Sequence, residues 1–134
     1  MLDLSKPFKE TVQENPFASL TTDGDFETPS LFDMVRLIEH AKQDANVKGI
    51  YILASDNANA FGASEEIRKA LLDFRKTKKF VVAYGETISQ KGYAIANVAQ
   101  KIFVHPQGGL EWAGFSSNLI FLKGMLDKLE IKPQ

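Results

Sequence analysis

The sequence contains no cysteine, and only two of its 134 residues are histidine. Without cysteine the chain can form no disulfide and can offer no thiolate as a nucleophile or metal ligand. The two histidines, His40 and His105, stand far apart and form no spaced group of the kind that binds zinc. Walker-type and GxGxxG phosphate-binding sequences are missing as well. We therefore expect no metal site, no cofactor and no serine–histidine–aspartate triad.

A large excess of one charge and a long apolar run are also absent. The chain has 16 basic and 17 acidic residues, which gives a formal net charge of −1. This balance argues against a surface for nucleic acid and against direct attachment to an anionic membrane. No apolar stretch approaches the roughly 20 residues that span a bilayer, and the N-terminus has no signal-peptide pattern.

The sequence does contain an alternation of strand and helix patterns. With 44% hydrophobic and 25% charged residues, it has the composition of a soluble globular domain, and its length suffices for one core. Residues 1–29 are irregular and punctuated by proline, so we expect an edge segment there. The later alternation, with short connections, predicts an α/β fold with a mostly parallel sheet covered by helices. The expected elements are a helix of about four turns after Ser30, a strand at 49–53, a helix after Ser64, a strand at 80–84, a helix at 89–100, a strand at 101–104 and a final helix after Ser116 or Ser117.

Local patterns set the expected helix starts and strand environments. Ser30 is a capping residue with Asp33 three positions later, and Ser64 is followed by two glutamates suited to a first helical turn. The strands at 49–53 and 80–84 are continuously apolar, which predicts burial on both faces. The pair Gly108-Gly109 predicts a turn.

The last expected helix is apolar nearly all round. Ile120, Phe121 and Met125 lie off its leucine face, so the helix should be buried on more than one side. We expect these three residues to contact another subunit in a homo-oligomer. The chain starts abruptly in strand-like sequence and stops abruptly at Ile131–Gln134, so we expect residues 1–134 to be a single domain, the N-terminal half of a longer two-domain protein.

Two loops that follow the apolar strands form the candidate site, because parallel sheets bind ligands at the carboxyl ends of their strands. The first loop runs from Ser55 to Ala63 and the second from Glu86 to Gly92. Backbone N–H groups at such strand ends can stabilise an oxyanion. The candidates for a substrate groove are Asn57, Ala58, Phe61, Gly62, Ser89, Gln90 and Lys91.

Ser89 and Lys91 raise the question of a serine nucleophile with a lysine base. Ser89 stands at the start of an expected helix, where serine ordinarily caps the free N–H groups. A lysine acts as a base only where burial depresses its pKa, and Lys91 stands in a polar stretch. We therefore expect Ser89 to be a helix cap and not a nucleophile.

Several short sequences together carry a resemblance to a known family. From Leu31 to its end, the chain resembles the N-terminal domain of the protease IV family, the signal peptide peptidases A. That family is similar to the Clp protease and crotonase superfamily, so the resemblance implies repeated strand-strand-helix units. The sequences that carry it are Gly85-Glu86, Ser89-Gln90, Gly92-Tyr93, Lys101–Val104, Pro106–Gly108, Gly114-Phe115 and Leu126–Leu129.

The resemblance implies a serine nucleophile and a lysine base that lie in different domains. Matching Gly92-Tyr93 to the family's motif puts Gln90 at the nucleophile position, with Ser89 as the small residue before it. Residues 57–60 lack the two glycines that form the oxyanion hole in the catalytic copy. The site is thus expected to be vacated, with no catalytic residue inside the chain.

The base lysine of the family is expected just beyond Gln134. Lys128 and Lys132 precede the expected motif, so neither is assigned that role. The chain by itself should then be soluble and inactive, since it would hold neither member of the serine–lysine pair.

The resemblance also implies what the whole protein does. It implies a hydrolase that degrades cleaved signal peptides, with peptide substrates and the C-terminal protease domain as partners. It places that protein in the bacterial inner membrane, on the extracytoplasmic (periplasmic) side, through an anchor outside this chain. Two alternatives stay open. One is a crotonase-type acyl-CoA enzyme, because residues 59–67 resemble that family's oxyanion loop; the other is a non-catalytic, oligomerising binding module.

Overall fold

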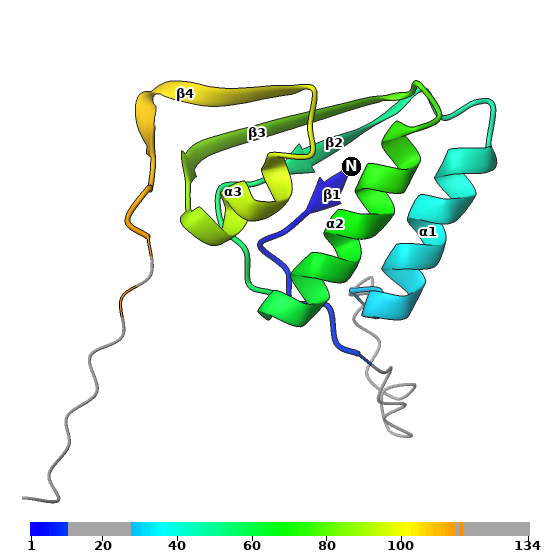
Figure 1. Cartoon of the computed structure of the whole chain (residues 1–134), viewed down its shortest axis with the longest axis horizontal. Coiled ribbons are helices and arrows are strands. Elements are labelled where there is room, and N and C mark those ends of the chain that lie inside the picture. Colours follow the sequence, from blue (N-terminus) through cyan, green and yellow to red (C-terminus); the bar gives the residue numbers. More distant parts are fainter. Residues whose placement is uncertain (11–27, 115, 117–134) are drawn as a thin grey trace, which may run out of the picture.

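The computed structural model describes residues 1–10, 28–114 and 116, and within them strands and helices alternate (Figure 1). The four strands form one sheet in the order β1-β2-β3-β4, and each neighbouring pair is parallel. The predicted α/β fold with a parallel sheet is therefore confirmed. The elements are β1 (Leu2–Asp3), α1 (Leu31–Gln43), β2 (Gly49–Leu53), α2 (Phe61–Arg75), β3 (Phe80–Ile88), α3 (Gln90–Ala96) and β4 (Lys101–Leu110).

The strand order decides where the helices lie. Right-handed crossovers put every connecting helix on the same face when the strand order never reverses. Figure 1 shows α1, α2 and α3 together on one face of the sheet. The core lies between that face and the helices. Its fully buried side chains include Ile52 of β2, Val81 and Ala83 of β3, Ile67, Leu71 and Phe74 of α2, and Ile95 of α3.

The other face of the sheet carries a row of partly exposed apolar side chains. Leu53, Tyr84 and Phe103 are neighbours across three strands, and Tyr51 lies beside Val82. Phe103 is 53% exposed and Tyr51 38%. The prediction that the strands at 49–53 and 80–84 are buried on both faces is therefore wrong for the described residues. The reason is that all three described helices cover the opposite face.

Helix α1 begins where the sequence predicts. The Ser30 hydroxyl accepts a hydrogen bond from the Asp33 N–H at 3.1 Å, which satisfies a donor that the helix leaves free. At the other end, the Lys79 ammonium donates to the carbonyl oxygens of Ala41 and Asp44, each at 2.7 Å. Both ends of the helix are thus satisfied by side chains.

Helix α2 begins four residues earlier than predicted. It starts at Phe61 after Ala60, and Ser64 lies inside it, with its N–H bonded to the Ala60 carbonyl at 2.9 Å. The Ser64 hydroxyl was expected to cap the helix. Instead it accepts a hydrogen bond from the buried Asn57 side chain at 2.9 Å. Consequently, the two glutamates lie beyond the first turn.

Strands β3 and β4 are longer than predicted. They pair over Val82–Gly85 and, after an irregularity, again at Thr87 and Ile88, so each strand contributes two successive paired stretches. Gly108 lies within β4 and not in the predicted turn. A Cβ at this position would collide with the Glu86 carbonyl oxygen, so glycine here permits two backbones to approach closely.

The expected final helix, with Ile120, Phe121 and Met125, lies outside the described residues. Within the described part of the chain, no helix is both long enough and apolar enough to cross a membrane. Across these same residues, no three histidine, aspartate or glutamate side chains are grouped to hold a metal ion.

Candidate functional site

The first loop and the segment Glu86–Gly92 lie against each other at the carboxyl ends of β2 and β3. The prediction that Glu86–Gly92 is a loop is wrong, because this segment is the end of β3, the cap Ser89 and the first turn of α3. The Glu86 N–H donates to the Ser55 hydroxyl at 3.0 Å, and the Ser89 N–H donates to the Ser55 carbonyl at 3.1 Å. Ser55 therefore joins the first loop to that segment through both its side chain and its backbone. Sequence reasoning did not single out this residue, because its partners are more than thirty positions away.

A buried polar network supports the first loop from beneath. Asn57 and Asn59 are each 2% exposed. The Asn57 amide nitrogen donates to the Ser64 hydroxyl and, at 3.2 Å, to the Lys91 carbonyl, so it links α2 to the first turn of α3. Asn57 was predicted to line the groove, but its side chain is buried. The other candidates from this part of the chain, Ala58, Phe61 and Gly62, are exposed.

Asn59 extends the network to the N-terminal segment. Its side-chain oxygen accepts from the Phe8 N–H at 2.7 Å, and its nitrogen donates to the carbonyls of Leu4 and Lys6 at 3.4 and 3.3 Å. The nitrogen also donates to the Asn57 side-chain oxygen at 3.0 Å. The alternation Asn-Ala-Asn in the loop after β2 was the available sequence sign that two amides point inward together.

Ser89 caps α3, as the sequence predicts. Its hydroxyl accepts a hydrogen bond from the Gly92 N–H at 3.1 Å. The Lys91 ammonium lies 5.7 Å from the centre of the Phe61 ring, in a cation–π contact with α2. The two side chains are thus engaged separately, Ser89 with its own helix and Lys91 with a neighbouring one.

Gln90 contacts the chain segment that follows β4. Its side-chain oxygen accepts from the Gly114 N–H at 2.8 Å. Two further contacts hold the same segment. The Glu111 N–H donates to the Ile88 carbonyl at 2.9 Å, and the rings of Tyr93 and Trp112 meet edge to face with centres 5.1 Å apart. Residues 111–114 therefore pass directly over the start of α3.

Comparison with known proteins identifies the family. The model of peptidase family S49 matches residues 73–134. Over 106 residues the chain is 42% identical to Protease 4 of Salmonella typhi, a match that covers 76% of this chain and 17% of that protein. The chain belongs to the peptidase S49 family.

Further peptidase S49 relatives show how much longer these proteins are. Protease 4 of Haemophilus influenzae (strain ATCC 51907 / DSM 11121 / KW20 / Rd) is 32% identical over 78% of this chain and 17% of its own length. The chloroplastic serine protease SPPA of Arabidopsis thaliana is 30% identical over 70% of this chain and 14% of its own length. The chain thus spans about a sixth of the length of the relatives it matches.

The peptidase S49 match includes one of the two segments that meet at the site. Residues 73–134 contain the segment Glu86–Gly92, with Ser89, Gln90 and Gly92, whereas the first loop at 55–63 lies outside the match. The resemblance stated above from the residues of this segment is therefore supported by a comparison over that same stretch.

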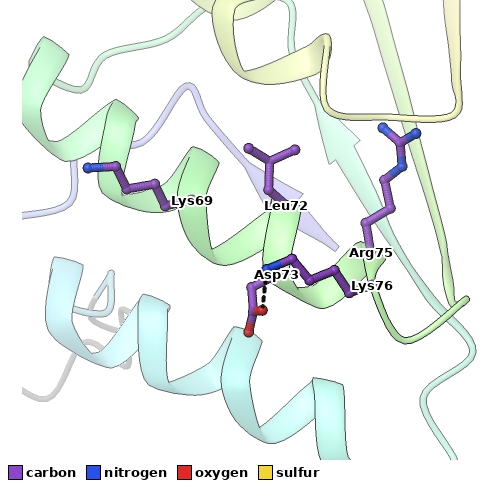
Figure 2. Close-up of a pocket in the computed structure, with 5 residues that line it drawn as sticks. All are labelled: Lys69, Leu72, Asp73, Arg75 and Lys76. Carbon is purple, nitrogen blue, oxygen red and sulfur yellow. Dashed lines mark ion pairs between the residues drawn. The ribbon is translucent and has the colours of Figure 1, made fainter.

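A surface hollow on α2 lies apart from this site in the peptidase S49 chain. It is lined by Lys69, Leu72, Asp73, Arg75 and Lys76 (Figure 2). Helices between parallel strands run back along the sheet, so the C-terminal end of α2 lies at the opposite edge from the loops. Two of its three cations have partners within the fold. Arg75 donates to the Val98 carbonyl at 2.7 Å, and Lys76 pairs with Asp73 at 3.3 Å.

Asp73 also pairs with Lys42 of α1, so one carboxylate joins two helices. Hydrogen bonds from Lys42 and then from Lys76 hold the pKa of the Asp73 carboxyl below its usual value, against a smaller opposing effect of burial. These charges stabilise the packing of α1 on α2, and nothing about them indicates a reaction.

Proposed function

We propose that this chain is a non-catalytic part of a serine protease, a segment of the N-terminal domain of a two-domain peptidase S49 enzyme, since it matches only 17% of the length of each Protease 4 relative. One observation carries the proposal. Gln90, at the position that the family resemblance assigns to the nucleophile, has no hydroxyl, and its side-chain oxygen is bonded to the backbone of Gly114. Catalysis by a serine–lysine pair requires the serine to lie within hydrogen-bond reach of its base, and the neighbouring Ser89 and Lys91 have other partners.

In the complete enzyme we assign the nucleophile to the second domain and the base to a lysine beyond Gln134. The substrates are cleaved signal peptides, and the site of action is the bacterial inner membrane on its extracytoplasmic side. The name of the Arabidopsis relative, a serine protease, supports the choice of reaction. Membership of the peptidase S49 family also favours the protease over the acyl-CoA enzyme considered from residues 59–67.

The exposed part of the site is the proposed wall of the substrate groove. Ala58 in the first loop and Phe61 and Gly62 at the start of α2 are exposed, with Lys91 against the Phe61 ring. An extended peptide would lie across these residues, and the second domain would supply the reacting groups.

We also propose that copies of this chain associate with one another. The partly exposed row of Tyr51, Tyr84 and Phe103 on the sheet supports it, because parallel sheets are ordinarily covered on both faces. Ile120, Phe121 and Met125 are the further contact residues proposed from the sequence.

The test is to label the complete enzyme with a fluorophosphonate, which reacts with activated serines, and to locate the modified residue by mass spectrometry. We expect a labelled serine in the second domain and none within residues 1–134. Peptide hydrolysis should persist in Ser89→Ala and disappear when the labelled serine is replaced. A label on Ser89, or loss of hydrolysis in Ser89→Ala with folding intact, would refute the assignment.

A further inference from the structure

The segment that follows β4 is held by three contacts of different kinds. A backbone hydrogen bond joins Glu111 to Ile88, a ring contact joins Trp112 to Tyr93, and a side-chain hydrogen bond joins Gly114 to Gln90. All three partners belong to the end of β3 or to the first two turns of α3. The direction in which the chain leaves the sheet is therefore set at the candidate site.

The contact at Gly114 comes last along the chain and controls the exit direction most directly. Gly114 has a φ of +74°, in the left-handed region that favours glycine. Its N–H is held by Gln90 at 2.8 Å, and both the glycine and the bond are exposed to solvent. Because the bond is exposed, its loss leaves no buried group without a partner, so the stability of the whole fold should change little when it is removed.

We propose that Gln90 is a positioning residue: it fixes residues 111–114 over α3 and thereby sets where the following chain begins. The inference rests on the proposed function, in which the chain beyond residue 116 leads to the base lysine. Gln90 would then influence the reaction indirectly, by positioning the segment that leads to the base lysine.

The length and acceptor of the Gln90 side chain make the inference specific. The donor is a backbone N–H, so the contact needs only an acceptor oxygen at the reach of a five-atom side chain. Glu at position 90 keeps that oxygen at the same reach. Asn has the oxygen but is one methylene shorter, and Ala has no acceptor at all. The series Gln90→Glu, Gln90→Asn and Gln90→Ala therefore separates the hydrogen bond from the mere presence of a polar side chain.

The first experiment uses Trp112, which is the single tryptophan of the sequence. Its fluorescence anisotropy and near-ultraviolet circular dichroism report how firmly residues 111–114 are held in the 134-residue chain. We expect Gln90→Ala and Gln90→Asn to lower both values, and Gln90→Glu to retain them. Far-ultraviolet circular dichroism and thermal melting confirm that each variant folds. Unchanged Trp112 values in Gln90→Ala, or equal losses in Gln90→Glu, would overturn the positioning role.

The second experiment places the same variants in the complete protease and measures peptide hydrolysis. We expect Gln90→Ala to lower kcat by about ten- to a hundredfold with little change in KM, as for a reacting group displaced by about an ångström. Gln90→Glu should restore kcat. If Gln90→Ala lowers the Trp112 anisotropy and circular dichroism but leaves kcat unchanged, then Gln90 does not position the base lysine. If the unmodified complete chain does not hydrolyse peptides, the proposed function itself fails, and the Trp112 values alone decide whether Gln90 holds the segment.

Discussion

The backbone of Ala54 occupies the space into which a side chain at position 92 would extend. A Cβ on Gly92 would lie well inside contact distance of the Ala54 carbonyl oxygen. Because this carbonyl belongs to the backbone at the end of β2, it cannot rotate away as a flexible side chain would. The first turn of α3 can therefore rest on the sheet only if residue 92 is glycine.

Gly92→Ala should consequently destabilise the chain. We expect a loss of about 1–3 kcal/mol in the free energy of unfolding, the range for an inserted methyl group that forces the backbone to shift. Urea denaturation measures the change. Gly62→Ala is the matched control, since a Cβ there meets no described atom within 4 Å and the residue is also helical. Equal effects of the two substitutions would contradict the close approach.

The neighbouring glycines Gly108 and Gly109 should respond differently to the same substitution. A Cβ on Gly108 would overlap the Glu86 carbonyl oxygen, whereas one on Gly109 meets no described atom within 4 Å. We expect Gly108→Ala to cost about 1–3 kcal/mol in urea denaturation and Gly109→Ala to leave stability nearly unchanged. If Gly108→Ala is tolerated as well as its neighbour, β3 and β4 do not approach as described.

Asn59 should be more important for stability than an ordinary surface asparagine. Its side chain joins the segment Leu4–Phe8 to the first loop through buried hydrogen bonds. Asn59→Ala leaves the buried Phe8 N–H without its acceptor, so we expect a cost of about 1–3 kcal/mol. Faster proteolysis within residues 1–10 should accompany it. Exposed Asn97 provides the control, and a similar cost for Asn97→Ala would argue against a special role for Asn59.

The pairing of Asp73 with two lysines should make part of the stability depend on pH. The pKa of the Asp73 carboxyl is lower in the folded chain than its ordinary value of 3.8, so the folded state favours the ionised form. The associated stability is present above that value and is lost as the pH falls through the lower folded pKa. We therefore expect Asp73→Asn to lower the melting temperature at neutral pH, with a difference that shrinks under strongly acidic conditions.

A double-mutant cycle with Lys42→Met tests the cause of this pH dependence. If the ion pair is responsible, Asp73→Asn should have a smaller effect once Lys42 is absent. The assignment would be contradicted if the difference in melting temperature between the native chain and Asp73→Asn were the same at every pH. It would also be contradicted if the effects of Asp73→Asn and Lys42→Met on stability were simply additive.

Local sequence patterns predicted some helix caps correctly and mistook other residues for caps or turns. The caps at Ser30 and Ser89 were predictable because donor and acceptor lie three residues apart in the sequence. Ser64 looked like a cap by the same local rule, but its hydroxyl is engaged by Asn57, a partner that only the fold brings near. Gly108-Gly109 looked like a turn because the local rule does not include the Glu86 carbonyl on the adjacent strand.

The candidate site likewise has features that the local sequence predicts and features that depend on contacts between distant residues. The placement of the first loop and of Glu86–Gly92 at the carboxyl edge followed from the alternation of strands and helices alone. The contact between Gln90 and Gly114 spans 24 positions and depends on where β4 ends, ten residues along a strand that was expected to be shorter. The buried role of Asn57 was equally hidden, because its partners lie on two different helices.

The order of the strands has a consequence for how a peptide could be gripped. Open sheets that hold a ligand unaided do so in the crevice where two successive crossovers diverge to opposite faces. Within the described residues the order runs β1-β2-β3-β4 without reversal, so the crossovers never diverge and this part of the sheet has no such crevice. For the proposed peptide groove we therefore expect a second polypeptide surface to form the opposite wall.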